Sequence, residues 1–574
     1  MCGSKNQFKT EGFFTMRLLY RIFPFLLLMF FVVQCDEIVT TDQLEDPTGV
    51  PPEEVDPDFM LNSIQQNTQE FYNSASNLAG EMARMHHMFG RTYEDAYTPE
   101  NFNGVYESAY SDLLIDTQNI QPVAEEQQLY FHLGVAKVAQ AYAMITLVDM
   151  FGPVPWEEAL DEDVFEPDLT DDESIYQEAL ALLDEAKDDL QNENRVAFPE
   201  FELIYPELSG DALVDAWVRV ANTIKFKSYL NMGDEQGLAD MLDEPMITDP
   251  AHDFTFEFST SDTDPDARHP SFSANYVGAT STFLSVAYMG MLLNDKDDFG
   301  KDPRMRYYFY RQTNVDSDDP NELTCDNEAV PGHFESDDPW CQLGDGYWGW
   351  NHLIDSGIPP EANLRTTYGV YPAGGEFDAD QPTLQETRAI PTSDDMGLQG
   401  AGFHPMLMSS YTYFMKAEAA EVYGVGNQSA QDYLAEAVEL SLNTVREFGA
   451  PLATEAAGGA FEMTDEDINE YLDEVMDNYN DEGALRTIAK EYYLALWPNG
   501  IEAYNSMRRT HYPNQEDNLQ PTQTSDPGDW YRSFPYSSNL IDRNQNVGPK
   551  DSRLEGPFWD ENRWQGADRE AFNF

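Results

Sequence analysis

Positive charge is scarce in this chain of 574 residues. Lys and Arg number 32 against 105 Asp and Glu, so the formal net charge is −73 at pH 7. A surface this acidic repels phosphate, which excludes nucleic-acid binding through a general basic surface. Self-repulsion of this size is tolerable where salt screens charge strongly, with a Debye length of roughly 3 Å near 1 M. The composition therefore favours a halophilic protein; the alternative is an acidic protein that simply binds cations.

Long apolar runs are also missing from the body of the chain, which excludes a multi-span membrane protein. Apolar residues still make up 41% of the sequence and aromatic residues 13%, enough for a large buried core. The sequence has no phosphate-binding glycine loop followed by Lys, no His-Glu-x-x-His zinc helix and no Gly-x-Ser-x-Gly nucleophile elbow. With 105 acidic residues, paired carboxylates carry almost no information about glycosidase chemistry. We therefore predict no catalytic site and no required cofactor.

The N-terminus has the features of an export signal. Arg17 and Arg21 precede an apolar stretch at residues 22–33, which is too short to span a bilayer comfortably and has the dimensions of a signal-peptide core. We expect residues 1–34 to be a signal peptide. Met16, just before the basic pair, is the expected true start of the chain.

Cysteine occurs only four times, and Cys35 directly follows the apolar stretch. Its position resembles that of the lipidated cysteine of bacterial lipoproteins, although Gln34 departs from the small residue usual before it. The alternative is an ordinary signal peptide with a chance cysteine. Residues 35–56 are acidic and contain proline, as expected of a tether between a lipid anchor and the folded body.

Two further cysteines, Cys325 and Cys341, lie close together in an aromatic, Asp-rich segment. In an exported protein such a pair most simply forms a disulfide, which is the prediction here. A zinc site is the weaker interpretation, because no second cysteine pair or closely spaced histidine pair completes four ligands.

A calcium site is a weak candidate at Asp262, Asp264 and Asp266. These residues have the spacing of the first three ligands of a calcium loop. Ala267 and Ser273 stand where an EF-hand needs Gly and Glu, so the segment is not an EF-hand. A solvated acidic loop is favoured over a looser, structural Ca²⁺ site.

Amphipathic helices dominate the chain after residue 56. Apolar spacing predicts helices near residues 122–151, 173–190, 211–232, 406–424, 430–448 and 480–497. Paired amphipathic helices with small residues at their crossings predict an all-α fold on a tetratricopeptide-like helical-repeat scaffold. Residues 245–400 and 510–574 instead read as large irregular segments with minor short strands, for example at 254–258 and 307–310. We expect one domain over residues 57–574, with the loop-rich insertion at about 245–400.

Aromatic residues gather inside this insertion, at Trp340, Tyr347, Trp348, Trp350, Tyr368 and Tyr371. Flat aromatic faces stack on the apolar faces of sugar rings, so rings at this density among Gly and Asp suit carbohydrate binding. The alternative is that the rings pack the insertion onto the helices. Under the binding hypothesis, replacing Trp348 or Trp350 lowers affinity and leaves stability nearly unchanged.

Six short segments are distributed over nearly the whole mature chain. They are Phe-Gly-Pro-Val-Pro at 151–155, Trp-Val-Arg-Val-Ala-Asn at 217–222, Asp-Pro-Arg at 302–304, Arg-Thr-Thr-Tyr-Gly-Val-Tyr-Pro at 365–372, Lys-Ala-Glu-Ala at 416–419 and Glu-Ala-Tyr-Asn-Ser-Met-Arg-Arg at 502–509. In sequence and in order, these segments resemble one family, the SusD/RagB-like outer-membrane lipoproteins of Bacteroidota.

The resemblance implies a non-enzymatic, lipid-anchored protein of the outer cell surface. It would capture nutrients, usually oligosaccharides, over a SusC-like TonB-dependent transporter in the outer membrane. Relatives bind glycan with the segment after the first long helix and with central loops, which correspond here to Arg91, Tyr93 and Tyr97 and to residues 347–371. Two alternatives stay open: a secreted glycoside hydrolase, and a structural surface lipoprotein that binds only its barrel partner.

Overall fold

Most secondary structure in the protein is α-helical, which confirms the predicted fold class. The computed structural model describes residues 55–161, 163–277, 283–294, 301–312, 330–334, 338, 340, 343–344, 346–354, 365–379, 392–514 and 521–563. The predicted signal peptide, Cys35 with nearly all of the tether, and the candidate disulfide partners Cys325 and Cys341 lie outside these residues.

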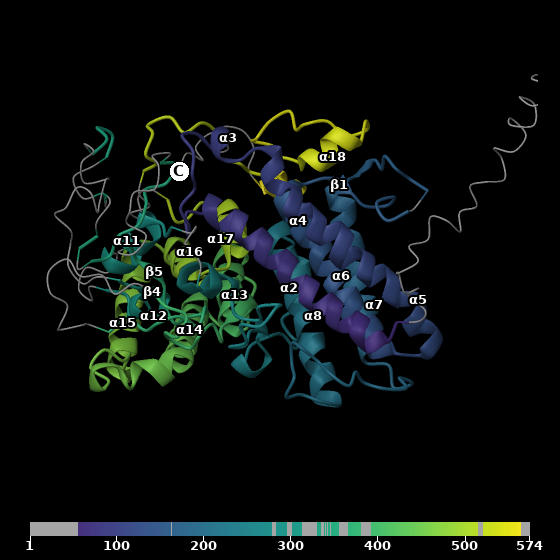
Figure 1. The fold of residues 1–574 in the computed structure, drawn as a ribbon, viewed down its shortest axis with the longest axis horizontal. Helices are drawn as coiled ribbons and strands as arrows, with labels where there is room; N and C mark the ends of the chain where they lie inside the picture. Colours follow the sequence, from purple (N-terminus) through teal and green to yellow (C-terminus); the bar gives the residue numbers. More distant parts are fainter. Residues whose placement is uncertain are drawn as a thin grey trace, which may run out of the picture. The chain divides into compact units, whose positions relative to one another are not determined.

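One group of helices comes from the first half of the chain (Figure 1). Helix α6 packs against α2, α5 and α7, and α7 packs in turn against α8. A short π-helical stretch, Ser108–Leu114, leads directly into α5. The bounds of this group are Pro57–Met82 for α2, Tyr93–Ala96 for α3, Asn103–Glu107 for α4, Ile115–Gln127 for α5, Tyr130–Phe151 for α6, Asp172–Leu190 for α7, Asp211–Met232 for α8 and Glu235–Asp240 for α9.

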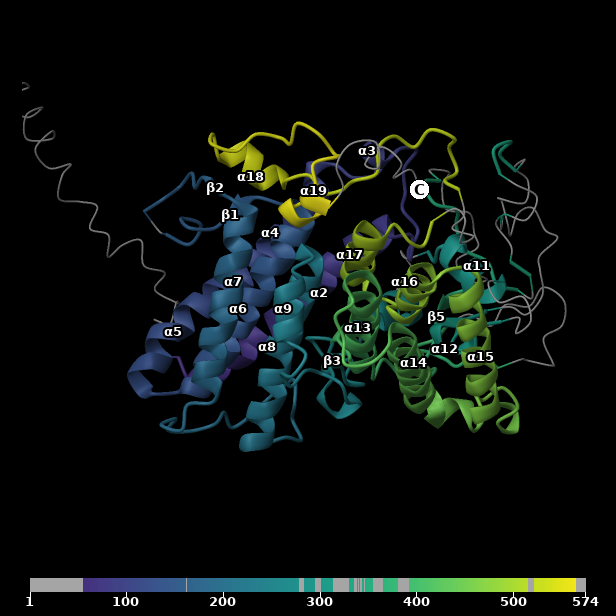
Figure 2. The same cartoon turned by 180° about the vertical axis from the view of Figure 1, so that it is seen from behind.

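A second group, best seen from behind, comes from residues beyond 400 (Figure 2). Each of its long helices packs on the next one along the chain, the arrangement of a helical-repeat scaffold. The bounds are Ser409–Tyr423 for α13, Ala430–Ala453 for α14, Asp465–Asp481 for α15, Ala484–Ala495 for α16 and Gly500–Thr510 for α17.

Two glycines allow α17 and α2 to touch backbone to backbone. A Cβ atom on Gly500 would lie 2.1 Å from the Ser76 carbonyl oxygen and 2.2 Å from the backbone nitrogen of Gly80. Separations this short are impossible for a side chain, so glycine is required at the crossing. The contact joins the two helix groups next to the C-terminal end of α2.

Short elements fill the loop-rich segments, as the sequence predicts. The three sheets each have two antiparallel strands, and the longest pairing sets Phe254 opposite Leu407 and Glu257 opposite Phe403. The strands are β1 Val154–Pro155 with β2 Leu169–Thr170, β3 Phe254–Glu257 with β6 Phe403–Leu407, and β4 Phe309–Tyr310 with β5 Thr367–Tyr368. The short helices are α10 Pro270–Phe272, α11 Val286–Asn294, α12 Met305–Tyr308, α18 Ser538–Arg543 and α19 Phe558–Arg563.

Helix boundaries agree with the sequence except where local breakers act. The predicted helix at 122–151 is two helices, because Gln128 adopts a left-handed conformation with φ of 58° and ends α5. Conversely, α14 runs through Pro451 to Ala453 instead of stopping near residue 448. The predicted helix at 406–424 starts at Ser409, because the residues before it pair as β6.

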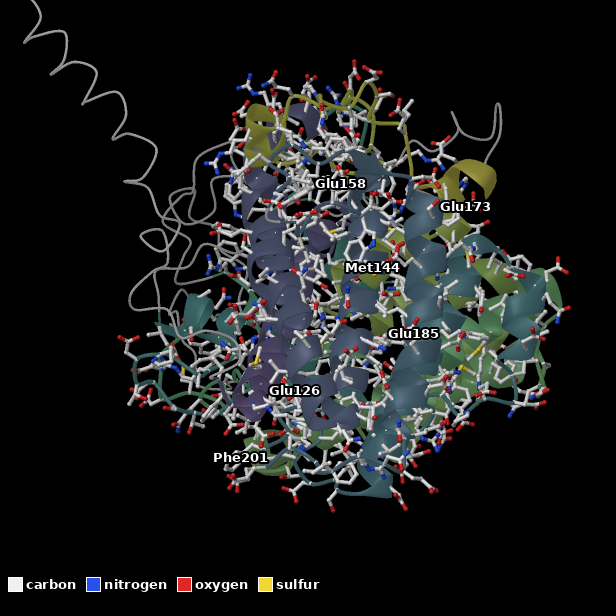
Figure 3. The ribbon with its side chains drawn as sticks, turned by 90° about the vertical axis from the view of Figure 1, so that its right-hand side faces the viewer. Glu126, Met144, Glu158, Glu173, Glu185 and Phe201 are labelled. Atoms are coloured by element: carbon white, nitrogen blue, oxygen red, sulfur yellow. The ribbon has the colours of Figure 1, made fainter. Side chains whose placement is uncertain are left out.

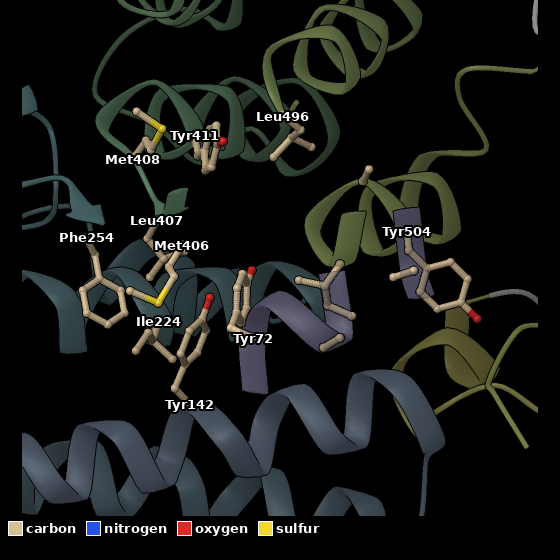
Figure 4. Close-up of a cluster of buried hydrophobic side chains, with 14 of the residues drawn as sticks. Tyr72, Tyr142, Ile224, Phe254, Met406, Leu407, Met408, Tyr411, Leu496 and Tyr504 are labelled. Atoms are coloured by element: carbon tan, nitrogen blue, oxygen red, sulfur yellow. The ribbon is translucent and has the colours of Figure 1, made fainter. Parts of the chain in front are cut away.

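The core runs through the contact between the two helix groups. Helix α6 is long and apolar enough to cross a membrane, yet 89% of its most apolar stretch is buried in the protein. It is therefore the central helix of the core. Figure 4 shows Tyr72 of α2 and Tyr142 of α6 facing residues of β3, β6 and α13. The two tyrosine rings stack at 4.9 Å, and the Tyr72 hydroxyl donates to Glu502 of α17 at 3.1 Å.

Charge is divided between the surface and the interior. The labelled glutamates in Figure 3, Glu126, Glu158, Glu173 and Glu185, are all exposed, whereas Met144 of α6 is buried. An unusually large number of Lys and Arg side chains are buried. Among the residues that the structure describes, eleven Lys and Arg side chains are buried: Arg84, Lys225, Lys227, Arg268, Arg304, Arg311, Arg365, Lys490, Arg508, Arg509 and Arg532.

Candidate functional site

The segment that follows α2 is held between two parts of the insertion. The His87 amide donates to the Phe283 carbonyl at 3.1 Å, and the Leu353 amide donates to the Met88 carbonyl at 3.1 Å. Gly349 permits a third close approach, because a Cβ there would lie 2.4 Å from the carbonyl oxygen of Leu284. These backbone contacts bring the end of α2 and the aromatic insertion to one place.

A cavity of about 340 Å³ lies at this junction. Its volume is at the lower end of the range of small-molecule sites, roughly 300–1,000 Å³. We call it the histidine pocket, because two adjacent histidines form part of its wall. The lining residues are Asn73, Asn77, Glu81, His86, His87, Phe89, Pro270, Ser271, Ala274, Phe283 and Tyr368.

One wall of the histidine pocket is aromatic. Phe89 lines the cavity and is 40% exposed. Its ring packs edge-on against His87 at 4.4 Å between centroids and lies 6.0 Å from Trp350 and 6.1 Å from Phe283. The buried rings behind Phe89 hold it in place, so it presents a rigid apolar face to the pocket.

Another part of the lining is polar and comes from α2. Asn73, Asn77 and Glu81 follow one another at four-residue spacing, which places them on one face of the helix. Neither asparagine side chain hydrogen-bonds to another described residue. The Tyr97 hydroxyl donates to Oε2 of Glu81 at 3.0 Å, while Oε1 accepts no hydrogen bond from the described residues. This wall therefore offers two amides and one carboxylate oxygen to a ligand.

The pocket has no positively charged side chain among its lining residues at neutral pH. Burial lowers the pKa of His86 to about 4 and that of His87 to about 3, so both rings are neutral. A hydrogen bond of 2.6 Å joins His86 Nε2 to the Tyr368 hydroxyl. Burial raises the pKa of Glu81 to about 7, although the Tyr97 hydrogen bond acts in the opposite direction.

The aromatic residues predicted to bind sugar are not open platforms in this structure. Exposure is 2% for Tyr347, 1% for Trp348, 8% for Trp350, and 2% each for Tyr368 and Tyr371. The structure thus contradicts the expectation that Trp348 or Trp350 stands free of the scaffold. The reason is that the insertion folds inward and uses these rings as its own core. Only Tyr368 reaches the histidine pocket.

The second predicted segment borders the pocket without supplying a ring to it. Arg91 is exposed, whereas Tyr93 and Tyr97 are 1% and 3% exposed. The Tyr97 hydroxyl shares its one proton between the Leu78 carbonyl at 2.6 Å and Oε2 of Glu81 at 3.0 Å, so it helps to position the carboxylate. The candidate site is therefore formed by residues just before 91–97, namely His86, His87 and Phe89.

A larger cavity of about 530 Å³ lies between the segment around Tyr97 and the C-terminal residues. Several of its polar side chains are engaged within the protein. Lys550 donates to the Ser533 hydroxyl at 2.6 Å and to a backbone carbonyl, Arg553 is paired with Glu94, and the Tyr536 hydroxyl donates to a carbonyl at 2.7 Å. These contacts attach the C-terminal segment, so we prefer the histidine pocket as the ligand site.

The candidate calcium residues are not assembled as a metal site. Asp266 forms a two-pronged ion pair with Arg268, with both N–O distances at 2.9 Å, and this pairing lowers the pKa of Asp266 to about 2. Asp262 and Asp264 are exposed. The described part of the chain contains no group of three or more His, Cys, Asp or Glu side chains that could hold a metal ion.

Three of the motifs that carry the family resemblance, at 302–304, 416–419 and 502–509, contribute to buried ion pairs and not to the histidine pocket. Each partner is at most 3% exposed, so these pairs lie within the packed interior. The pairs are Asp302–Arg304, Lys227–Glu502 and Glu418–Arg509, with N–O distances of 2.6, 2.5 and 2.9 Å.

Two family profiles match the chain. One, described as starch-binding and associating with the outer membrane, matches residues 50–340; the other, described as SusD and RagB outer membrane lipoprotein, matches residues 393–561. The chain belongs to the SusD/RagB family. Proteins of this family are outer-membrane lipoproteins that bind nutrients, among them carbohydrates, and are binding proteins rather than enzymes.

Solved structures share the fold over nearly the whole chain. A SusD/RagB family protein from Bacteroides thetaiotaomicron has 18% identity and a TM-score of 0.64, covering 88% of this chain and 99% of its own. A SusD homologue from Bacteroides uniformis has 17% identity and a TM-score of 0.56, with coverages of 88% and 99%. A chitin-binding SusD homologue from Flavobacterium johnsoniae has 14% identity and a TM-score of 0.54, with coverages of 87% and 97%. No curated protein sequence matches the chain.

Sequence reasoning missed most of the histidine pocket. Helix α2 ends at Met82 and Arg84 is left-handed with φ of 61°, so His86 and His87 lie in the turn beyond the helix. The one available signal was the polar residues at four-residue spacing along α2. No expected helix covered that segment.

Proposed function

We propose that the histidine pocket binds an oligosaccharide and that the protein captures this nutrient at the cell surface. The observation that carries the proposal is that one pocket combines the half-exposed Phe89 ring, which buried rings support, with two amides and a carboxylate oxygen that no described residue engages. A sugar ring has the complementary surface, with an apolar face for stacking and hydroxyl groups at its rim. A chitin-binding relative with the same fold supports a glycan as the ligand.

The test is binding to a glycan array, followed by calorimetric titration of the glycans captured. Phe89→Ala should weaken binding by about 5- to 150-fold, the scale of losing one well-placed aromatic contact at roughly 1–3 kcal/mol. Its thermal midpoint should stay near that of the wild type, since Phe89 is 40% exposed.

Phe165→Ala is the matched control, because Phe165 is 88% exposed and lies in the β1–β2 connection, away from the pocket. Equal affinity of wild type and Phe89→Ala would remove the histidine pocket from consideration. Loss of binding in the Phe165 variant as well would point to a general surface effect.

We also propose that Cys35 carries the lipid anchor and that captured ligand passes to a SusC-like TonB-dependent transporter. The family to which the chain belongs and the cysteine after the apolar stretch support this proposal. Cys35→Ala should move the protein from the outer-membrane fraction to the soluble fraction. Affinity capture of the wild type should also recover a TonB-dependent barrel; unchanged fractionation of the variant would remove the anchor from the proposal.

A further inference from the structure

We propose that Glu81 makes the histidine pocket selective for uncharged sugars and against sugars that bear carboxylates. The inference rests on the proposed function and adds the ligand class. Glu81 is the one acidic side chain among the residues that line the pocket.

Glu81 has no cationic partner in the described structure. No ion pair links it to any described Lys, Arg or His, and its single protein contact is the hydrogen bond from Tyr97. This isolation is informative, since Arg84 and Arg365 are buried nearby. Arg84 donates to the Tyr93 hydroxyl at 3.3 Å, and Arg365 lies over the Phe283 ring at 4.8 Å and donates to Asn275. Both guanidiniums thus have contacts elsewhere.

The groups around Glu81 do not change charge between pH 5 and pH 9. Burial lowers the pKa of His86 to about 4 and that of His87 to about 3, below this range, and it raises the pKa of the Tyr97 hydroxyl above the range. The asparagines on the same helix face are uncharged. Within this range Glu81 alone sets the charge of the pocket.

An uncharged sugar can donate a hydroxyl proton to the free Oε1 of Glu81, forming a strong hydrogen bond to an ionised acceptor. A uronate brings a second carboxylate into a partly desolvated pocket, where like charges repel strongly. The uronate can bind without this repulsion only when Glu81 takes up a proton. Uronate binding should therefore be coupled to protonation, whereas binding of the uncharged sugar should favour the ionised form.

The test uses two forms of one ligand. The uncharged member is the tightest binder among malto-, cello-, xylo-, laminari- and chito-oligosaccharides. The charged member is the same oligosaccharide oxidised to the uronate at C6, or, for a pentose backbone, the matching glucuronate-substituted oligosaccharide. At pH 8 the uronate should bind the wild type at least tenfold more weakly, and its affinity should fall by up to tenfold per pH unit above pH 7.

Glu81→Gln should bring the two affinities to within about threefold and abolish the pH trend. Glu70→Gln, an exposed carboxylate on the same helix, should behave like the wild type. Equal binding of both ligand forms by the wild type at pH 8, or an unchanged preference in Glu81→Gln, would overturn the selectivity. Absence of any array binding by the wild type would instead overturn the proposed function, and the selectivity with it.

Discussion

Trp350→Ala distinguishes two roles for the rings of the aromatic insertion: packing of the insertion's own core, as the structure indicates, and direct sugar binding, as the sequence suggests. Trp350 is 8% exposed and packs 5.1 Å from Phe283 and 5.5 Å from His87, in a small cluster with Ile354. Truncation of a buried tryptophan costs about 3–5 kcal/mol. For a folded unit of roughly 520 residues, the unfolding entropy is about 1.1 kcal/mol/K, so the thermal midpoint should fall by about 3–5 °C.

The assay is thermal unfolding of wild type and Trp350→Ala, with binding measured well below both midpoints. Affinity for the captured glycan should fall several-fold, because Phe89 loses a ring that supports it. Phe165→Ala, at 88% exposure, should leave both quantities unchanged. A variant with an unchanged midpoint and a large loss of affinity would show that Trp350 contacts the ligand directly, and would refute the argument from burial.

Three further predictions concern charge. Arg509→Met leaves the buried Glu418 carboxylate unpaired and should lower the free energy of unfolding by about 3–5 kcal/mol. Adding Glu418→Leu should restore most of this loss, as thermal unfolding of the single and double variants would show. The pKa of Glu81 is raised to about 7 in the fold, so its ionisation destabilises the protein as pH rises from about 4.5 to 7. Glu81→Gln should therefore be more stable than wild type above pH 7 and equal to it near pH 4; a less stable variant at pH 8 would contradict this sign. The thermal midpoint of the wild type should rise markedly between dilute buffer and 1 M NaCl, and a flat response would argue against halophilic adaptation.

Helices with a clear apolar stripe could be predicted from sequence almost to the residue. The helix expected at 211–232 is α8, and the one expected at 173–190 begins one residue earlier, with Asp171 as its N-cap. The N-cap side chain accepts from the Ser174 amide at 3.0 Å. These cases succeed because apolar spacing and capping residues are local properties of the chain.

Helix α2 escaped prediction because it contacts several neighbours at once. It packs on α5 and α6, carries the glycine contact with α17, and presents Asn73, Asn77 and Glu81 to the pocket. Small and polar residues at these contacts interrupt the regular apolar spacing by which a helix is predicted. The helix does begin with recognisable signals, the N-cap Asp56 and Pro57 after it.

The candidate site could be located only roughly, since burial is a long-range property. The sequence marked the aromatic insertion and the region after the first long helix, and the pocket forms where these two segments meet. It could not tell that Trp348 would be buried and Phe89 exposed, because both are aromatic residues in irregular segments. That distinction depends on backbone pairing between residues far apart in the chain, such as Ser285 with Trp350.

The burial of basic side chains has a consequence for proteolysis. Trypsin-like enzymes cut after Lys and Arg, and among the residues whose exposure the structure describes only Arg91, Lys301 and Arg543 are exposed. Acid-specific endoproteinases that cut after Glu face the reverse situation, because carboxylates cover the helices shown in Figure 3. In a habitat rich in secreted trypsin-like proteases, folding would therefore leave few of the described cleavage sites fully exposed.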